Sequence, residues 1–251
     1  MVEVNVHDES ITLDEPMLVE GFPGIGLAGK IVTDHLLDEG EFVHYASVHC
    51  ETLQQISVYH TGDRTVRAPL RMYADPDGSL LILSSDIPVK LDKSGSFVEC
   101  LTAWFDRNEV FPIFLSGRPR QSKQQEAVAD PQVFGVASGS GLDRLDDLDL
   151  STPDENGAIS GPTGALLLRC AELDLDAVGL VVESSVQFPD PMAARFLIEK
   201  GVDPLIDRET DTETLIQHAE DIREQREALA ASMSQADQES SSQAQPLGMF
   251  Q

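Results

Sequence analysis

The chain has 251 residues, and its 44 aspartates and glutamates against 17 lysines and arginines give a formal net charge of −27 at pH 7. Such an excess of negative charge repels phosphate backbones and anionic lipid headgroups, which argues against nucleic acid and membranes as partners. The hydrophobic fraction of 41% is ordinary for a globular protein, so we expect most of the chain to fold around a core.

The acidic residues are spread along the chain, as in 36–41, 143–149 and 172–176, rather than gathered in one segment. This distribution favours adaptation of the whole surface to high salt, as in proteins of extremely halophilic archaea, over a dedicated acidic binding face. The net charge therefore indicates the salt environment of the protein and says little about its function.

Cys50, Cys100 and Cys170 are far apart and form no CxxC pair, so we expect reduced core cysteines rather than a disulfide framework or a zinc site. The first ten residues lack the basic and apolar parts of a signal peptide. The longest apolar runs have the length of strands, which is too short for a transmembrane helix. These features predict a cytoplasmic protein.

Apolar runs of strand length alternate with helical patterns over most of the chain. We expect strands at 17–22, 42–49, 79–89, 110–115, 133–136 and 177–183. We expect helices at 25–37, 97–105, 162–173 and 191–200. Asp190 and Gly201 are suitable caps for the two ends of the helix at 191–200.

Residues 51–74 have the pattern of two more strands, joined in a hairpin at Thr61-Gly62-Asp63. A hairpin is antiparallel, whereas alternating strands and helices form parallel pairs. The sequence therefore predicts a three-layer αβα fold with a mixed sheet over residues 1–206.

The last quarter of the chain differs in composition. Residues 207–231 predict a highly charged helix, which packs on its own domain or pairs between subunits. Residues 232–251 predict a disordered tail, because 232–246 are polar and without core residues. The tail nevertheless ends in the apolar stretch 247–250, followed by Gln251.

Gly24, Gly26 and Gly29 form a G-x-G-x-x-G pattern between a predicted strand and a predicted helix. Such a turn can hold an anion at the helix N-terminus, or simply allow the helix to pack closely on the sheet. A dinucleotide site also requires an acid at the end of the second strand, and Glu51 lies late for this role. A third interpretation, intermediate between these two, is that the turn forms a pocket for a small ligand.

Candidate catalytic groups are few. His44 and His49 lie an odd number of residues apart on one predicted strand, so we expect them on opposite faces and in no shared metal site. Glu183 and Asp190 flank a strand-to-helix turn and could form an acid/base pair, although capping also accounts for Asp190. No HExxH, GxSxG or SxxK pattern occurs. We expect no enzyme, no metal and no cofactor.

Three further motifs occur in order along the chain: EGFPGIGLAG at 20–29, GPTGALL at 161–167 and FPDPMAAR at 188–195. In this combination the sequence resembles the archaeal branch of the proteasome assembly chaperone 2 family. The resemblance implies an αβα fold like that of purine nucleoside phosphorylases, without their catalytic residues. It also implies homo-oligomers and a role in assembling or engaging the proteasome.

The resemblance also implies a binding role for the last three residues. Proteasome activators and some of these chaperones end in a hydrophobic–tyrosine–any tripeptide, which docks between α-subunits of the proteasome core particle. This chain ends in Met249-Phe250-Gln251. Phe250 in place of tyrosine loses one hydroxyl hydrogen bond, worth about 0.5–1.5 kcal/mol.

The resemblance thus implies a non-enzymatic proteasome assembly chaperone or activator-like protein. Its tail would dock on the α-subunits of the core particle. The alternative is a small-molecule or nucleotide-binding protein, or an enzyme, that uses the glycine turn with Glu183 and Asp190.

We predict that the fold depends on salt, because a net charge of −27 must be screened in the compact state. The temperature of thermal unfolding should rise steadily between dilute and molar potassium chloride. Equal unfolding temperatures across the series would show that the acidic surface is not a salt adaptation.

Overall fold

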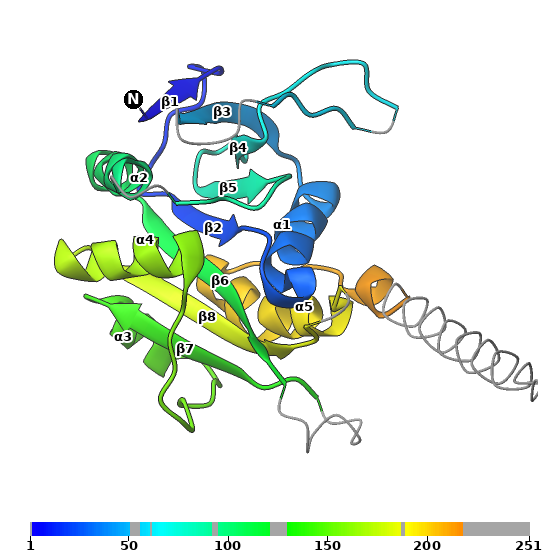
Figure 1. Cartoon of the computed structure of the whole chain (residues 1–251), viewed down its shortest axis with the longest axis vertical. Coiled ribbons are helices and arrows are strands. Elements are labelled where there is room, and N and C mark those ends of the chain that lie inside the picture. Colours follow the sequence, from blue (N-terminus) through cyan, green and yellow to red (C-terminus); the bar gives the residue numbers. More distant parts are fainter. Residues whose placement is uncertain are drawn as a thin grey trace, which may run out of the picture.

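The described part of the chain forms one mixed sheet with helices on both faces (Figure 1). The computed structural model describes residues 2–50, 56–60, 62–91, 95–120, 130–186 and 189–217. Its strands are β1 (Val2–Val6), β2 (Met17–Gly21), β3 (Val43–Cys50), β4 (Leu70–Ala74), β5 (Leu80–Ser85), β6 (Phe111–Pro119), β7 (Val133–Ser138) and β8 (Ala177–Ser184). Its α-helices are α1 (Ala28–Glu39), α2 (Ser96–Arg107), α3 (Gly141–Asp146), α4 (Gly161–Glu172), α5 (Pro191–Leu197) and α6 (Asp203–Ile206).

The strand order is β1-β3-β4-β5-β2-β6-β8-β7. The four strands β5, β2, β6 and β8 in the middle are mutually parallel, and every other pairing is antiparallel. All six residues of β5 and all eight of β8 are buried, as expected for parallel strands covered on both faces. The carboxyl ends of the four parallel strands therefore meet at one edge of the sheet.

Successive residues of β2 point into two separate cores, because side chains alternate across a sheet. Leu18 belongs to the core shared with Phe97 of α2 and Leu166 of α4. Val19 belongs to the core shared with Val32 of α1 and Leu197 of α5. The helix pairs α2/α4 and α1/α5 thus cover opposite faces, which confirms the predicted three-layer mixed α/β fold.

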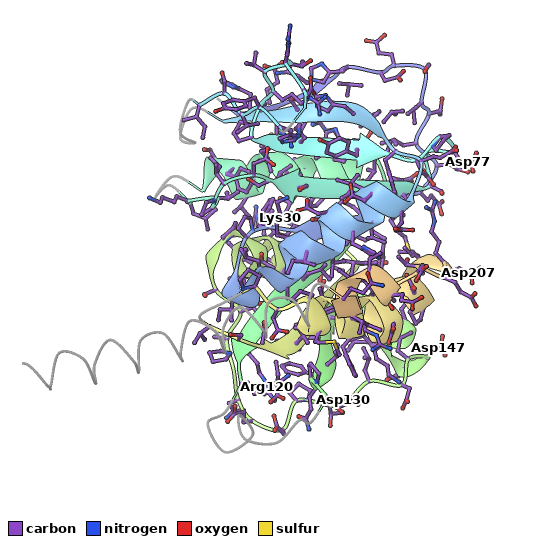
Figure 2. All side chains as sticks on the ribbon, turned by 90° about the vertical axis from the view of Figure 1, so that its right-hand side faces the viewer. Lys30, Asp77, Arg120, Asp130, Asp147 and Asp207 are labelled. Carbon is purple, nitrogen blue, oxygen red and sulfur yellow. The ribbon has the colours of Figure 1, made fainter. Side chains whose placement is uncertain are left out.

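The acidic surface is distributed over the molecule as the sequence indicates. Asp77, Asp130, Asp147 and Asp207 are all exposed and belong to different segments; Figure 2 shows Asp77, Asp207 and Asp147 along its right-hand edge and Asp130 at the bottom of the fold. Exposed acidic residues therefore occur on many segments of the part of the chain that the structure describes.

The predicted end of the helix at Gly201 is wrong. Asp190 does cap α5, but Gly201 lies inside a π-helical segment, η2 (Ile198–Val202), and the chain continues into α6. The helical run ends at Asp207, which has a φ of 51° in the left-handed region. A Cβ on Gly201 would lie 2.5 Å from Leu180 Cδ1, so the glycine allows this turn to pack on β8.

The predicted hairpin in 51–74 is present only as a single antiparallel bridge between Val58 and Arg67 among the described residues. The second predicted strand is β4, which pairs with β3 and β5 instead. Residues 51–55 and Thr61 lie outside the described residues. The antiparallel half of the sheet therefore comes mainly from β1, β3 and β4.

The expectation that His44 and His49 lie on opposite faces of the sheet is wrong. The pairing of β3 with β4 shifts register between His44 and Ala46, and such a bulge moves the residues beyond it to the other face. His44 and His7 consequently both contact Ser47 Oγ, at 3.1 and 2.9 Å. Tyr45 and Ala46 are both buried, and His44, Ser47 and His49 share the less buried face.

Helical structure is also described at 213–217, at the start of the predicted charged helix. The rest of this helix, the predicted tail at 232–251 and the terminal residues Met249, Phe250 and Gln251 lie outside the described residues. The division of the chain at 206 and 231 stays a prediction.

Candidate functional site

The three sequence motifs meet at the carboxyl ends of the parallel strands. Thr163, in the first turn of α4, donates a hydrogen bond from Oγ1 to Glu20 Oε1 of β2 at 3.2 Å. The backbone N–H of Asp190, before α5, donates to the carbonyl of Gly26 at 2.8 Å. We call this meeting point of 20–29, 161–164 and 183–190 the motif junction; within it, Gln187 and Phe188 lie outside the described residues.

Two glycines at the junction are required by close packing. A Cβ on Gly26 would lie 1.9 Å from Ser184 Oγ at the end of β8, and its φ of 62° is left-handed. A Cβ on Gly21 would lie 2.2 Å from the carbonyl oxygen of Gly29, where α1 crosses the end of β2. These contacts fill the space above Gly26 with protein atoms, as the packing interpretation of the glycine pattern requires.

Gly24 differs from Gly26, because a Cβ there would have only the Phe22 carbonyl oxygen nearby, at 3.9 Å. Its φ of −137° also suits any residue. In the η1 turn (Ile25–Leu27), Leu27 is left-handed with a φ of 52°. The glycine pattern therefore contains positions with different requirements, and packing does not account for Gly24.

Asp190 holds the turn between β8 and α5. Its Oδ1 accepts the backbone N–H of Ala193 at 3.1 Å, which confirms the predicted helix cap. Its Oδ2 accepts from the backbone N–H of Ser185 at 2.9 Å and from Ser184 Oγ at 3.2 Å. Both carboxylate oxygens are thus engaged in fixing the turn that meets Gly26.

Glu183 is directed away from this turn. It is buried, and its Oε1 lies 3.2 Å from Arg118 Nη2 of the neighbouring strand β6. Glu183 and Ser184 are adjacent in β8 and so face opposite sides of the sheet, and Asp190 is bonded to Ser184. The two carboxylates considered as an acid/base pair therefore have different partners on different faces.

Glu20 is a site residue that the sequence reasoning did not single out. It is completely buried, and its Oε1 accepts hydrogen bonds from the Phe22 N–H at 2.7 Å and from Thr163. Its Oε2 has no hydrogen-bond partner among the described residues. Burial raises the pKa of Glu20 to about 8, so the carboxyl is protonated at neutral pH. The available signal was an acid inside the apolar strand 17–22.

Membrane-spanning helices and clusters of metal ligands are both absent from the described residues. No helix there combines the length and apolarity needed to cross a bilayer. No three histidine, cysteine, aspartate or glutamate side chains converge there as metal ligands would.

The chain belongs to the PAC2 family, whose sequence profile matches residues 18–230. This match spans all three segments of the motif junction. An uncharacterised protein of Methanocaldococcus jannaschii is 26% identical over 226 residues, which cover 90% of each chain.

Two solved structures from Pyrococcus furiosus have the same fold. PbaA, described as an archaeal homolog of proteasome-assembly chaperone, has a TM-score of 0.79 at 22% identity, over 96% of this chain and 97% of its own. PbaB, described as an archaeal proteasome activator, has a TM-score of 0.74 at 19% identity, over 91% of this chain and 98% of its own.

We predict that Gly26→Ala lowers the free energy of unfolding by about 2 kcal/mol or more, because the new methyl meets Ser184 in a left-handed backbone conformation. Gly24→Ala is the matched control and should change it by less than about 0.5 kcal/mol. Chemical denaturation in molar salt measures both variants. Equal losses would contradict the packing role assigned to Gly26.

We predict that burial of Glu20 makes the protein less stable as pH rises. Its folded pKa of about 8 exceeds the ordinary value of 4.5, so the folded state holds the extra proton between these values. The contribution is fully present below pH 4.5 and is lost as pH rises through 8, with a slope of at most about 1.4 kcal/mol per pH unit.

The test compares Glu20→Gln with the parent protein in denaturation curves from pH 5 to 9. The variant should lose this component of the pH dependence and should gain stability relative to the parent toward pH 9. Glu99→Gln, at an exposed position on α2, controls for the loss of one acid. A Glu20→Gln profile parallel to the parent's would show that Glu20 does not bind a proton in the folded state.

Proposed function

We propose that this protein is a non-enzymatic, cytoplasmic proteasome assembly chaperone or activator-like protein. The observation that carries the proposal is membership of the PAC2 family over residues 18–230. The fold is shared along nearly the whole chain with PbaA and PbaB, whose descriptions concern proteasome assembly and activation. Proteins of this kind act through the partners they bind.

The contacts within the motif junction support a structural role for its turns rather than catalysis. The carboxylate of Asp190 is occupied by the β8–α5 turn, and Glu183 is paired with Arg118. Ser184 packs against Gly26, where an added Cβ would lie 1.9 Å from its Oγ. The alternative of a nucleotide-binding protein or enzyme that uses the glycine turn is therefore less well supported by the geometry.

The proposed contact with the proteasome is the C-terminal tripeptide, docking on the α-subunits of the core particle. The polar segment 232–246 has the composition of a flexible linker, and fifteen such residues span on the order of 20 Å. Met249 and Phe250 would supply apolar area, and the free carboxylate of Gln251 would pair with a basic group. A homo-oligomer would present several tails, and avidity would strengthen a modest single contact.

We predict that deletion of Met249–Gln251, or Phe250→Ala, reduces co-purification with the core particle in molar salt. Phe250→Tyr should preserve or strengthen it, because the phenol restores a hydrogen bond worth about 0.5–1.5 kcal/mol, or roughly two- to tenfold in affinity. Gln243→Ala, within the polar segment, is the matched control and should behave as the parent protein.

Equal recovery of the core particle with the intact and the shortened protein would remove the tail from the proposal. Any proteasome role would then rest on the folded body. Absence of the core particle from both samples would contradict the proposed function itself.

A further inference from the structure

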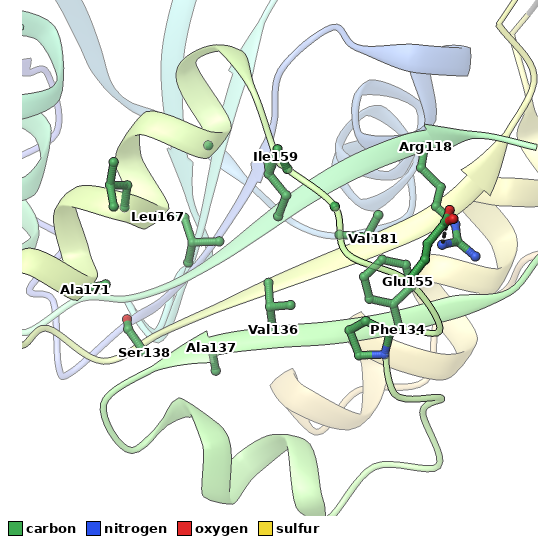
Figure 3. A pocket seen from close by; sticks show the side chains of 15 residues that line it. Arg118, Phe134, Val136, Ala137, Ser138, Glu155, Ile159, Leu167, Ala171 and Val181 are labelled. Atoms are coloured by element: carbon green, nitrogen blue, oxygen red, sulfur yellow. Dashed lines mark ion pairs between the residues drawn. The ribbon is translucent and has the colours of Figure 1, made fainter.

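A cavity of about 460 Å³ lies between α4, the strands β7 and β8, and the segment 153–159 (Figure 3). It adjoins the motif junction at Gly164, which lines the cavity, but Glu20, Gly26, Thr163 and Asp190 are not among the residues that line it. Its volume falls in the range of small-molecule pockets. Neither the chaperone role nor the tail contact makes use of it.

The walls of the cavity are mainly apolar. Phe134 and Val136 come from β7, Val181 from β8, Leu167 from α4 and Ile159 from the covering segment. These side chains line space instead of filling it, so an apolar ligand there would gain burial without displacing protein atoms.

The covering segment is held in place at both ends. A Cβ on Gly164 would lie 2.1 Å from the carbonyl oxygen of Ile159, so this glycine lets the segment lie directly against α4. At the other end, Asp154 Oδ1 accepts a hydrogen bond from Arg118 Nη1 at 3.0 Å. The cavity is therefore bounded by fixed contacts on both sides.

One end of the cavity carries an excess of negative charge. Arg118 pairs with Asp154, with Glu155 at 3.7 Å and with Glu183 at 3.2 Å, and its guanidinium lies 5.0 Å from the ring centroid of Phe134. Among the described residues, one guanidinium thus faces three carboxylates. Glu155 lines the cavity, and the side chains of Asp154 and Glu155 are 61% and 55% exposed, so this acidic end of the cavity is accessible from solvent.

We propose that this cavity binds a small organic amine, with an apolar body between Val136 and Leu167 and a cationic head beside Asp154 and Glu155. An anionic ligand of the same shape would meet an Arg118 already paired with carboxylates, together with the excess negative charge. A neutral ligand would gain only the apolar contacts. The selectivity follows from charge complementarity at the mouth.

The experiment compares tryptamine with indole-3-acetate, which share an indole body and carry opposite charges. Saturation-transfer NMR and calorimetry are carried out on the full chain, at the lowest potassium chloride concentration in which it stays folded. Tryptamine should bind at least several-fold more tightly than indole-3-acetate. Absence of tryptamine binding, or equal or tighter binding of the anion, overturns the proposal.

Two variants locate the site. Val136→Phe should fill the cavity and abolish tryptamine binding, with Leu142→Phe at an exposed position of α3 as the matched control. Glu155→Gln, at an exposed position, should leave the fold intact and weaken tryptamine binding about two- to fivefold, the range of one exposed ion pair. Glu39→Gln at the end of α1 should leave it unchanged.

If Val136→Phe unfolds the protein, the Glu155→Gln result alone decides whether the head group is received at the mouth. Tryptamine binding that neither Val136→Phe nor Glu155→Gln alters lies elsewhere on the protein and overturns the assignment to this cavity.

Discussion

Gly26 lies where the chain leaves β2 and meets the end of β8. Its carbonyl accepts the N–H of Asp190, and a single added methyl would overlap Ser184. Because this contact joins two backbones, it sets how closely α1 and α5 approach each other, and these helices share one core. The contact between the ends of β2 and β8 thus lies at a position where only glycine fits.

The opposite face depends on a different kind of contact at the same edge. Glu20 reaches under α4 and accepts from Thr163, as a neutral carboxyl rather than as one member of an ion pair. A charged carboxylate would cost more to bury there than one hydroxyl hydrogen bond returns. The bond between Glu20 and Thr163 thus ties β2 to α4 without placing a charge on Glu20 at neutral pH.

The sequence predicted the elements that have strong internal patterns. The buried strands β2, β5 and β8 and the amphipathic helix α2 were expected because their apolar periodicity is local. β1 was missed because it is an edge strand, defined mainly by its pairing with β3. α3 was missed because six residues carry too little periodicity to be distinguished from a turn.

The candidate site was predicted less completely than the fold. The glycine turn and the cap at Asp190 follow from local chemistry, so sequence reasoning found both. The bond between Glu20 and Thr163 joins residues far apart in the chain, and no local pattern indicates it. The expectation that His44 and His49 lie on opposite faces was wrong because of the bulge in β3. One extra residue there reverses the alternation of side chains between the two faces of the sheet.

The parallel centre of the sheet has a consequence for how the chain reaches its native state. Met17 pairs with Leu80 on one side and Phe111 on the other, and Ile113 pairs with Val178. Each pairing must close a long loop before its hydrogen bonds offset the lost chain entropy, so the folding rate is set by topology rather than by local propensity. While the centre is incomplete, the apolar strands β5 and β8 are exposed to other chains. Association of these strands between molecules therefore competes with folding until the parallel centre of the sheet is complete.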